Sequence, residues 1–459
     1  MPDLLDLPAK LIVYYLLLDL LDKQYFGMLN LAMMVFSYHS LTQLGVVDWL
    51  MYELPKKYVL KQKMDPLLTE SFFFSFINQL CLTGIIVLIL SFYRESLFFS
   101  IALVAYLFHT YFYNAYLHKT LFLRFQYKFE RLLRLRILLT LTRVTLEVLS
   151  IIYVGIYGFL AVQAFIFIVP IVILKTDIRL GFSSKMKPSR YLELARFGLP
   201  FFLVTLVATI ISNMDRWFIA SVYGLEWFAT YSVGIFIVTA ILIAPNKVLS
   251  ICTQYMKEMF ISDNSLNLNI KRTFSVNNFL IFILIIGLSA GLIFEYVILL
   301  YIPKYADLVQ FINVLMLSIV LRFSSALTAN TLYLLDERGA VLKIRIIMAG
   351  IYCLLLAAIY NFDLGMLFVI WGMSFVFLAQ TISCVFIVIS IPGVIMNSEI
   401  TKFLMLIVVS WIFYYLYDFT EMELPWILYM GLCCSIFFWR FSDSKNHLNY
   451  ISSRGFSRR

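Results

Sequence analysis

The chain has 459 residues, of which 62% are hydrophobic and 14% are charged, and its mean hydropathy is +0.89. In soluble globular domains about half of the residues are apolar and about a quarter are charged. This composition therefore excludes a soluble protein and indicates a chain whose surface lies mostly in a lipid bilayer. The formal net charge is +9 at pH 7.

Apolar stretches recur along the whole chain, and most could cross a hydrocarbon core of ~30 Å, which needs about 20 helical residues. The pattern predicts an all-α integral membrane protein with about 14 transmembrane helices. We place these spans at residues 4–21, 28–50, 71–92, 97–117, 137–156, 158–174, 197–214, 227–250, 277–301, 307–333, 342–361, 364–390, 400–417 and 424–440.

The basic residues predict the orientation of these spans. Alternate connections carry 28 of the 36 lysines and arginines, whereas the opposite connections carry only Lys23, Arg94, Arg216 and Lys304. Because basic connections stay in the cytoplasm, both termini are expected there. Topology and attraction to anionic membrane lipid account for the positive charge, so no nucleic-acid partner is expected.

The first two spans hold two candidate coupling residues. Asp19 lies toward the outer end of the first span, where a gate residue and a solvated span end are both possible. His39 lies one helical turn before Gln43 in the second span. A buried histidine that hydrogen-bonds its neighbours is the alternative to a coupling role for His39.

The fifth span contains Arg143 and Glu147, which are one helical turn apart. Side chains at this spacing can neutralise each other and hold the helix in place. Alternatively, Glu147 binds and releases a proton, so that its charge controls whether Arg143 is available to an anionic substrate. The second interpretation makes Glu147 a coupling candidate and Arg143 a substrate-binding candidate.

The long polar segment 175–196 divides the chain into two lobes of six spans each. We expect an N-terminal lobe at 1–174, a basic cytoplasmic linker at 175–196, a C-terminal lobe at 197–390, and two additional helices with a basic tail at 391–459. Six spans per lobe keep both lobes the same way up, as in parallel repeats related by an axis along the membrane normal.

The C-terminal lobe holds the remaining candidates. Arg322 lies near the middle of the tenth span, where a charge is costly and usually faces a bundle interior or an aqueous cavity. Ser318 and Ser325 share its helical face, and a guanidinium suits a diphosphate or an acidic sugar. The alternative is an arginine paired with a carboxylate or with backbone carbonyls. Lys247, near a cytoplasmic span end, is a secondary substrate-binding candidate.

Asp215 and Arg216 close the seventh span at its predicted outer end. A local pair at a helix end and a contact in an outer gate would both fit this position. They are therefore gate candidates.

The segment 195–235 resembles Wzx-type polysaccharide flippases of the multidrug/oligosaccharidyl-lipid/polysaccharide exporter superfamily. The resemblance rests on Phe197-Gly198-Leu199-Pro200, on Asn213-Met214-Asp215-Arg216 and on Tyr231-Ser232-Val233-Gly234. The stretch that begins at Tyr25 is also similar to the second span of those proteins.

This resemblance implies two six-helix bundles in a V-shaped arrangement around a central cavity, with the two C-terminal helices in addition. It also implies alternating access in the bacterial cytoplasmic (inner) membrane. The implied substrate is an undecaprenyl-diphosphate-linked oligosaccharide, the repeat unit of an O-antigen, capsule or exopolysaccharide. A polysaccharide polymerase and its chain-length machinery are the implied protein partners.

Other classes of protein are less compatible with the sequence. The six cysteines and four histidines show no metal-ligand spacing, and no phosphate-binding loop or dinucleotide fingerprint occurs, so neither a metal nor another cofactor is expected. A membrane-embedded polymerase needs a sizeable external loop, whereas the external connections here are short. A multidrug/cation antiporter needs acidic residues in its cavity, whereas the deep charged residues are mainly basic. Both remain alternatives to a non-enzymatic flippase.

Overall fold

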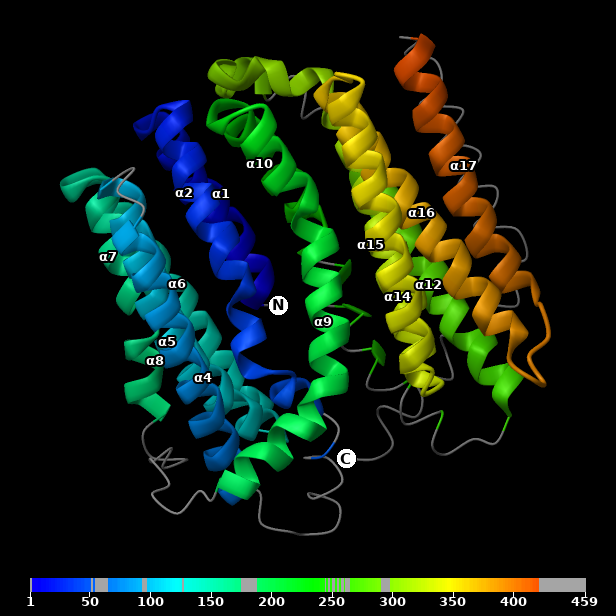
Figure 1. Cartoon of the computed structure of the whole chain (residues 1–459), viewed down its shortest axis with the longest axis horizontal. Helices are drawn as coiled ribbons and strands as arrows, with labels where there is room; N and C mark the ends of the chain where they lie inside the picture. The colour runs from blue at the N-terminus through cyan, green and yellow to red at the C-terminus, as the bar shows by residue number, and fades with distance from the viewer. Residues whose placement is uncertain are drawn as a thin grey trace. The chain divides into compact units, whose positions relative to one another are not determined.

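A computed structural model shows a helical protein. It describes residues 2–50, 53, 65–92, 97–125, 128–174, 188–243, 245–246, 248–249, 252–253, 256, 260, 265–289 and 298–420. Within these ranges every regular element is a helix (Figure 1). The elements are α1 (Pro2–Leu20), α2 (Lys23–Ser37), η1 (Tyr38–Gln43), α4 (Asp65–Phe92), α5 (Leu97–Phe125), α6 (Phe129–Val154), α7 (Ile156–Phe165), α8 (Ile168–Ile173), α9 (Pro188–Val222), α10 (Leu225–Ile241), α12 (Leu266–Ser289), η3 (Pro303–Gln310), α14 (Ile312–Leu334), α15 (Arg338–Asn361), α16 (Met366–Ser390) and α17 (Ser398–Thr420).

The helices form two compact units. The N-terminal unit comprises Met1–Asn213 with Tyr223–Ala229, and the C-terminal unit comprises Met214–Val222 with Thr230–Arg459. Helix α9 therefore contributes residues to both units. It begins at Pro188, so the last part of the expected linker is helical, while residues 175–187 lie outside the described ranges. The four-part division expected from the sequence stays a prediction.

The N-terminal unit is built around α5. This helix contacts α2, α4 and α7, while α6 contacts both α1 and α7. Aromatic and aliphatic side chains fill the space between α5, α6 and the α7–α8 region, including Tyr116, Leu132 and Phe167. The core lies near the C-terminal ends of α5 and α8. Lys119 of α5 is buried there and donates hydrogen bonds to the carbonyl oxygens of Ile171 and Leu174.

The second apolar span is not one continuous helix, and the expected helix 28–50 is wrong in this respect. Helix α2 ends at Ser37, and the short 3-10 helix η1 ends at Gln43. Leu44 and Gly45 then adopt positive φ angles of 44° and 70°. Gly45 lies against the backbone of Gly198 in α9, where a Cβ atom on either glycine would clash at under 3.0 Å. Close packing between two backbones therefore accompanies the break.

The C-terminal unit is built around α14, whose side chains are mostly buried. This helix contacts α12, α15, α16 and α17, and α15 also packs against α16. Large hydrophobic side chains such as Leu354 and Phe386 point outward from this unit, with exposed fractions of 72% and 68%. A water-facing surface rarely carries such residues in large numbers, whereas a lipid-facing one does.

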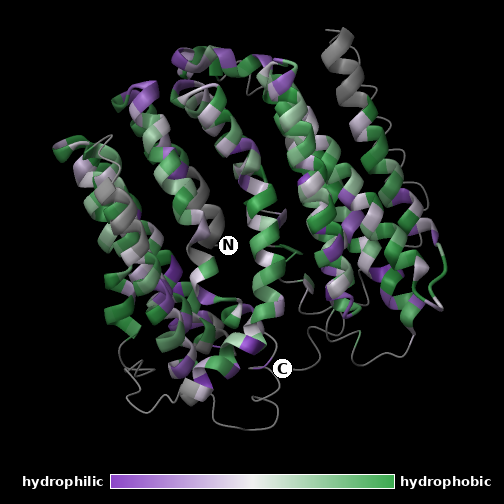
Figure 2. Cartoon of the chain, viewed as in Figure 1, coloured by the Kyte–Doolittle hydropathy of each residue, from purple (hydrophilic) through white to green (hydrophobic). Residues whose placement is uncertain are grey.

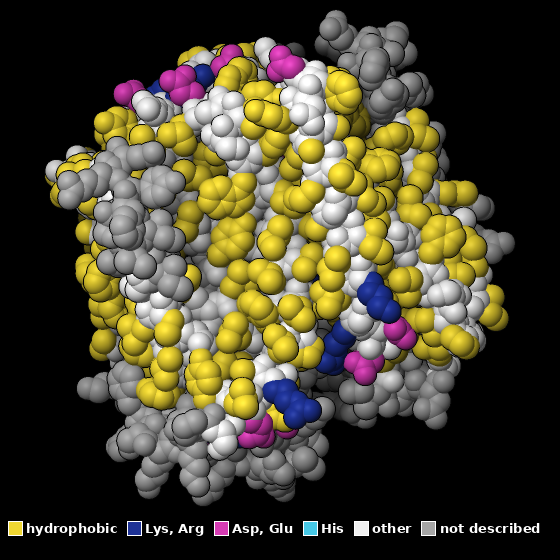
Figure 3. Space-filling view, viewed as in Figure 1, with side chains coloured by type: hydrophobic (Ala, Val, Ile, Leu, Met, Phe, Trp, Pro, Cys, Tyr) yellow, Lys and Arg dark blue, Asp and Glu magenta, His cyan; other side chains and the backbone are white. Residues whose placement is uncertain are grey.

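Length and composition agree with a membrane location. Among the described helices, eight are long and apolar enough to cross a bilayer. Hydrophobic residues predominate along α15 and α16 (Figure 2). They also cover most of the face in Figure 3, where the visible Lys, Arg, Asp and Glu side chains lie along the upper border and in the lower half. The total of fourteen spans stays a prediction, and the last of them, 424–440, lies outside the described residues.

Candidate functional site

A polar cluster in the C-terminal unit brings together charged residues from α9 and α14. Helix α9 continues to Val222, so Asp215 and Arg216 do not end it as expected. The Asp215 side chain is fully buried, with 0% exposed, and Arg216 is partly buried. Both residues interact electrostatically with Arg322 of α14. The expected helix end is therefore wrong, while the gate role of Asp215 and Arg216 stays a prediction.

One oxygen of the Asp215 carboxylate accepts a hydrogen bond from a neighbouring side chain. The hydroxyl group of Tyr231, in α10, donates a hydrogen bond to Asp215 Oδ2. Asp215 Oδ1 is buried and has no hydrogen-bond partner. The buried Tyr352 of α15 also interacts electrostatically with this carboxylate. One carboxylate oxygen therefore remains open to a donor that reorients or arrives.

Arg322 occupies the middle of α14, as the sequence analysis expected. No hydrogen bond or ion pair within 4.0 Å engages its guanidinium, or that of Arg216, among the described residues. Two guanidinium groups and one carboxylate leave the cluster with a formal charge of +1. A partly buried site with excess positive charge and uncommitted planar donors is suited to an oxyanion.

The two serines on the same helix are buried. Ser318 is fully buried, and its hydroxyl donates a hydrogen bond to the Leu315 carbonyl oxygen at 2.8 Å. Ser325 is 3% exposed. Hydroxyl groups that bond their own helix commonly serve to satisfy donors in apolar surroundings. A substrate-binding role for Ser318 and Ser325 stays a prediction.

A second polar network lies in the N-terminal unit. Arg143 Nε donates to Glu147 Oε1 at 2.7 Å, and the side chains are 26% and 2% exposed. Gln163 of α7 donates to the same oxygen at 2.6 Å. The one-turn contact expected from spacing is therefore present, and Gln163 extends it to a neighbouring helix. This geometry gives Glu147 a clear structural role, while its role in coupling stays a prediction.

The remaining sequence candidates are only partly described. Asp19 lies at the exposed end of α1. His39 belongs to η1, but its side chain lies outside the described part of the chain, as does Lys247 as a whole.

Sequence reasoning missed three partners in these networks, Gln163, Tyr231 and Asn278. Gln163 and Tyr231 each lie 16 residues from the carboxylate they bind. Asn278 of α12 donates to Glu399 Oε2 at 3.0 Å, and Glu399 forms a buried ion pair with Lys402, also at 3.0 Å. The sequence shows that each of these polar residues lies inside an apolar span, but it does not show which carboxylate each one contacts.

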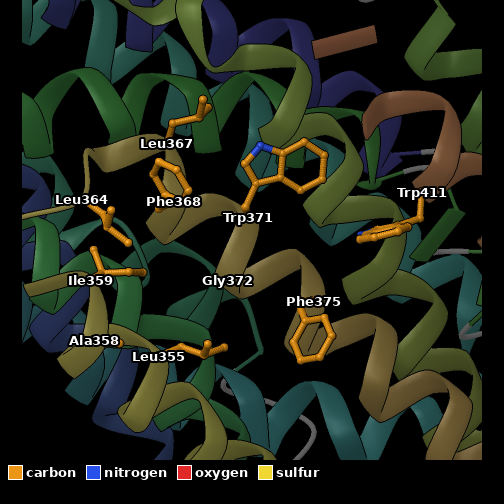
Figure 4. A pocket seen from close by; sticks show the side chains of 10 residues that line it. All are labelled: Leu355, Ala358, Ile359, Leu364, Leu367, Phe368, Trp371, Gly372, Phe375 and Trp411. Carbon is orange, nitrogen blue, oxygen red and sulfur yellow. The ribbon is translucent and has the colours of Figure 1, made fainter. Parts of the chain in front are cut away.

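An apolar pocket of about 450 Å³ lies between α15, α16 and α17 (Figure 4). Its lining includes Leu355 and Ile359 of α15, Phe368 and Trp371 of α16, and Trp411 of α17. The described residues that line it are uncharged. Their apolar side chains can contact a hydrocarbon group.

The fold is similar to that of several membrane transporters of known structure. The chain is similar to an inward-facing multidrug resistance MATE family transporter of the MOP superfamily, with a TM-score of 0.66 and 14% identity over 83% of this chain and 92% of that one. It is also similar to the lipid II flippase MurJ in an inward closed conformation, with a TM-score of 0.59 and 17% identity over 95% and 99%. A third similar structure is a MOP superfamily transporter from Pyrococcus furiosus, with a TM-score of 0.62 and 13% identity over 89% and 94%. At these identities the likeness concerns the fold.

The sequence identifies the family. Residues 16–310 match the profile of the family described as "Polysaccharide biosynthesis protein", so the chain belongs to that family. It is a multi-pass membrane protein with the fold of MOP superfamily transporters. A comparison with curated proteins found no significant match.

Proposed function

We propose that the protein is a flippase that moves an undecaprenyl-diphosphate-linked oligosaccharide across a bacterial cytoplasmic membrane by alternating access. Family membership supports a role in polysaccharide biosynthesis, and the fold supports a carrier. The observation that carries the proposal is the Arg216–Arg322 site, because its formal charge of +1 favours a ligand with a negatively charged diphosphate.

Arg322 is the residue that we assign to the diphosphate. Its position in the middle of α14 is costly for an unpaired charge, and a bound oxyanion would offset that cost. Arg143 is a weaker candidate because Glu147 already accepts a hydrogen bond from it. A multidrug/cation antiporter would need the opposite charge balance in the C-terminal unit.

The orientation is part of the same proposal. Both termini are placed in the cytoplasm because the basic residues concentrate in alternate connections. The glycan is then loaded at the cytoplasmic leaflet and released at the outer leaflet, where a polymerase consumes it. Reporter fusions at each terminus test the orientation, and an external C-terminus contradicts it.

Substitution of Arg322 tests the site. Arg322→Ala in a host that lacks the native gene should reduce glycan export at least tenfold, because the diphosphate loses a charged, bidentate partner. Arg322→Lys should retain part of the export, since it keeps the charge but loses the planar donor fork. The amount of each variant in the membrane is measured in parallel.

The matched control is Arg134→Ala. Arg134 is 78% exposed and pairs with Glu130 at the start of α6, so its removal should leave export unchanged. Wild-type export by Arg322→Ala at normal membrane levels would remove Arg322 from the site.

A further inference from the structure

Asp215 has an arrangement that structural pairing alone does not explain. Its carboxylate is fully buried. The Tyr231 hydroxyl group donates a hydrogen bond to Oδ2 and the backbone N–H of Arg216 also interacts with the carboxylate, but no side chain donates to Oδ1. A buried carboxylate that serves only to hold helices together is normally bonded at both oxygens.

The counter-charges for Asp215 are the two arginines of the same cluster. Arg216 and Arg322 both interact with it electrostatically, and neither makes an ion pair within 4.0 Å in the described part of the chain. Asp215 therefore neutralises part of their charge through space without occupying their donors. The donors remain free to bind a ligand while the net charge of the site is reduced.

We propose that Asp215 is a positioning residue that weakens the binding of the anionic substrate and so permits its release. The inference rests on the proposed function, because it requires a negatively charged ligand at Arg216 and Arg322. With Asp215 present, a diphosphate that approaches the arginines meets a nearby like charge. Without this charge, the two guanidinium groups would hold the diphosphate more tightly, and turnover would slow.

If Asp215 has this role, its replacement should change anion affinity in the direction opposite to that expected for a purely structural residue. A residue that only supports the site weakens binding when it is replaced. Neutralisation of Asp215 should instead tighten anion binding by about tenfold, the order expected when one like charge is removed from a partly buried site. The tightening should appear mainly as slower dissociation.

The experiment uses the purified full chain in phosphatidylcholine nanodiscs, with farnesyl diphosphate as the anionic probe and farnesol as its uncharged counterpart. Binding and dissociation rates are measured for the wild type, Asp215→Asn and Asp215→Ser. The two neutral variants guard against a folding defect in one of them. Asp215→Glu is the matched control, because it keeps the charge.

We expect the neutral variants to bind farnesyl diphosphate more tightly and to release it more slowly than the wild type. Asp215→Glu should behave as the wild type, and farnesol binding should be unchanged. Equal or weaker diphosphate binding in the neutral variants overturns the inference. Arg322→Ala, measured alongside, separates the two proposals. If it abolishes diphosphate binding while the neutral Asp215 variants do not tighten it, only the inference about Asp215 fails. If it leaves diphosphate binding unchanged, the proposed site itself fails.

Discussion

Replacement of Gly198 by alanine should destabilise the protein, because the new methyl group has no space. A Cβ atom there would lie under 3.0 Å from the carbonyl oxygen of Leu44 and 2.9 Å from the backbone nitrogen of Val46. Backbone atoms cannot rotate away as a side chain does, so α9 and the broken second span must separate. Overpacking of this kind costs about 1–3 kcal/mol. The better helix propensity of alanine offsets roughly 0.5–1 kcal/mol of this cost.

Gly84→Ala is the matched control. Gly84 lies inside α4 with open space where its Cβ atom would be, so alanine should there stabilise the helix by roughly 0.5–1 kcal/mol. Thermal unfolding of both purified variants in detergent is the assay, followed by circular dichroism. Gly198→Ala should melt below the wild type, and Gly84→Ala at or above it. Equal melting temperatures for the two variants would refute the close backbone contact.

Three further substitutions test the packing within single units, all by thermal unfolding of the purified protein. Glu147→Ala should destabilise the N-terminal unit by about 1.5–3 kcal/mol, because Gln163 and a guanidinium lose their shared acceptor; a wild-type melting temperature would show that the network is dispensable. Lys402→Met should lower the free energy of unfolding by about 3–5 kcal/mol, because Glu399 stays buried without its cation. Combining it with Glu399→Gln should restore much of this stability, and a double variant no more stable than Lys402→Met would contradict the pairing. Gly27→Ala should cost about 1–3 kcal/mol through a clash with a carbonyl group at the start of α10, and unchanged stability would exclude that contact.

Local hydrophobicity was sufficient to predict most spans but not their continuity. Residues 28–50 are apolar throughout, and nothing nearby in the sequence shows that the helix stops at Ser37. The positive φ angles at Leu44 and Gly45 occur where Gly198 packs against them, about 150 residues further along the chain. The Phe197-Gly198-Leu199-Pro200 motif was recognised, but the packing reason for its glycine required the fold.

Charges misled the prediction of one helix end. Asp215 and Arg216 made the seventh span appear to end, because charged residues are rare within bilayer-spanning helices. In the structure, Tyr231 and Arg322 come from other helices and give Asp215 a polar environment inside the unit, so α9 continues to Val222. The contact between Arg143 and Glu147 could be predicted because both residues lie on one helix, at a spacing that fixes their separation.

The most direct test of the central claim is to delete the gene in its own host and determine which leaflet of the cytoplasmic membrane holds the lipid-linked glycan that accumulates. A flippase predicts single repeat units confined to the cytoplasmic leaflet, with export restored by the wild-type gene but not by Arg322→Ala. Unpolymerised units on the outer leaflet would contradict this account and indicate a polymerase. An unchanged glycan together with new drug sensitivity would contradict it in favour of a multidrug exporter.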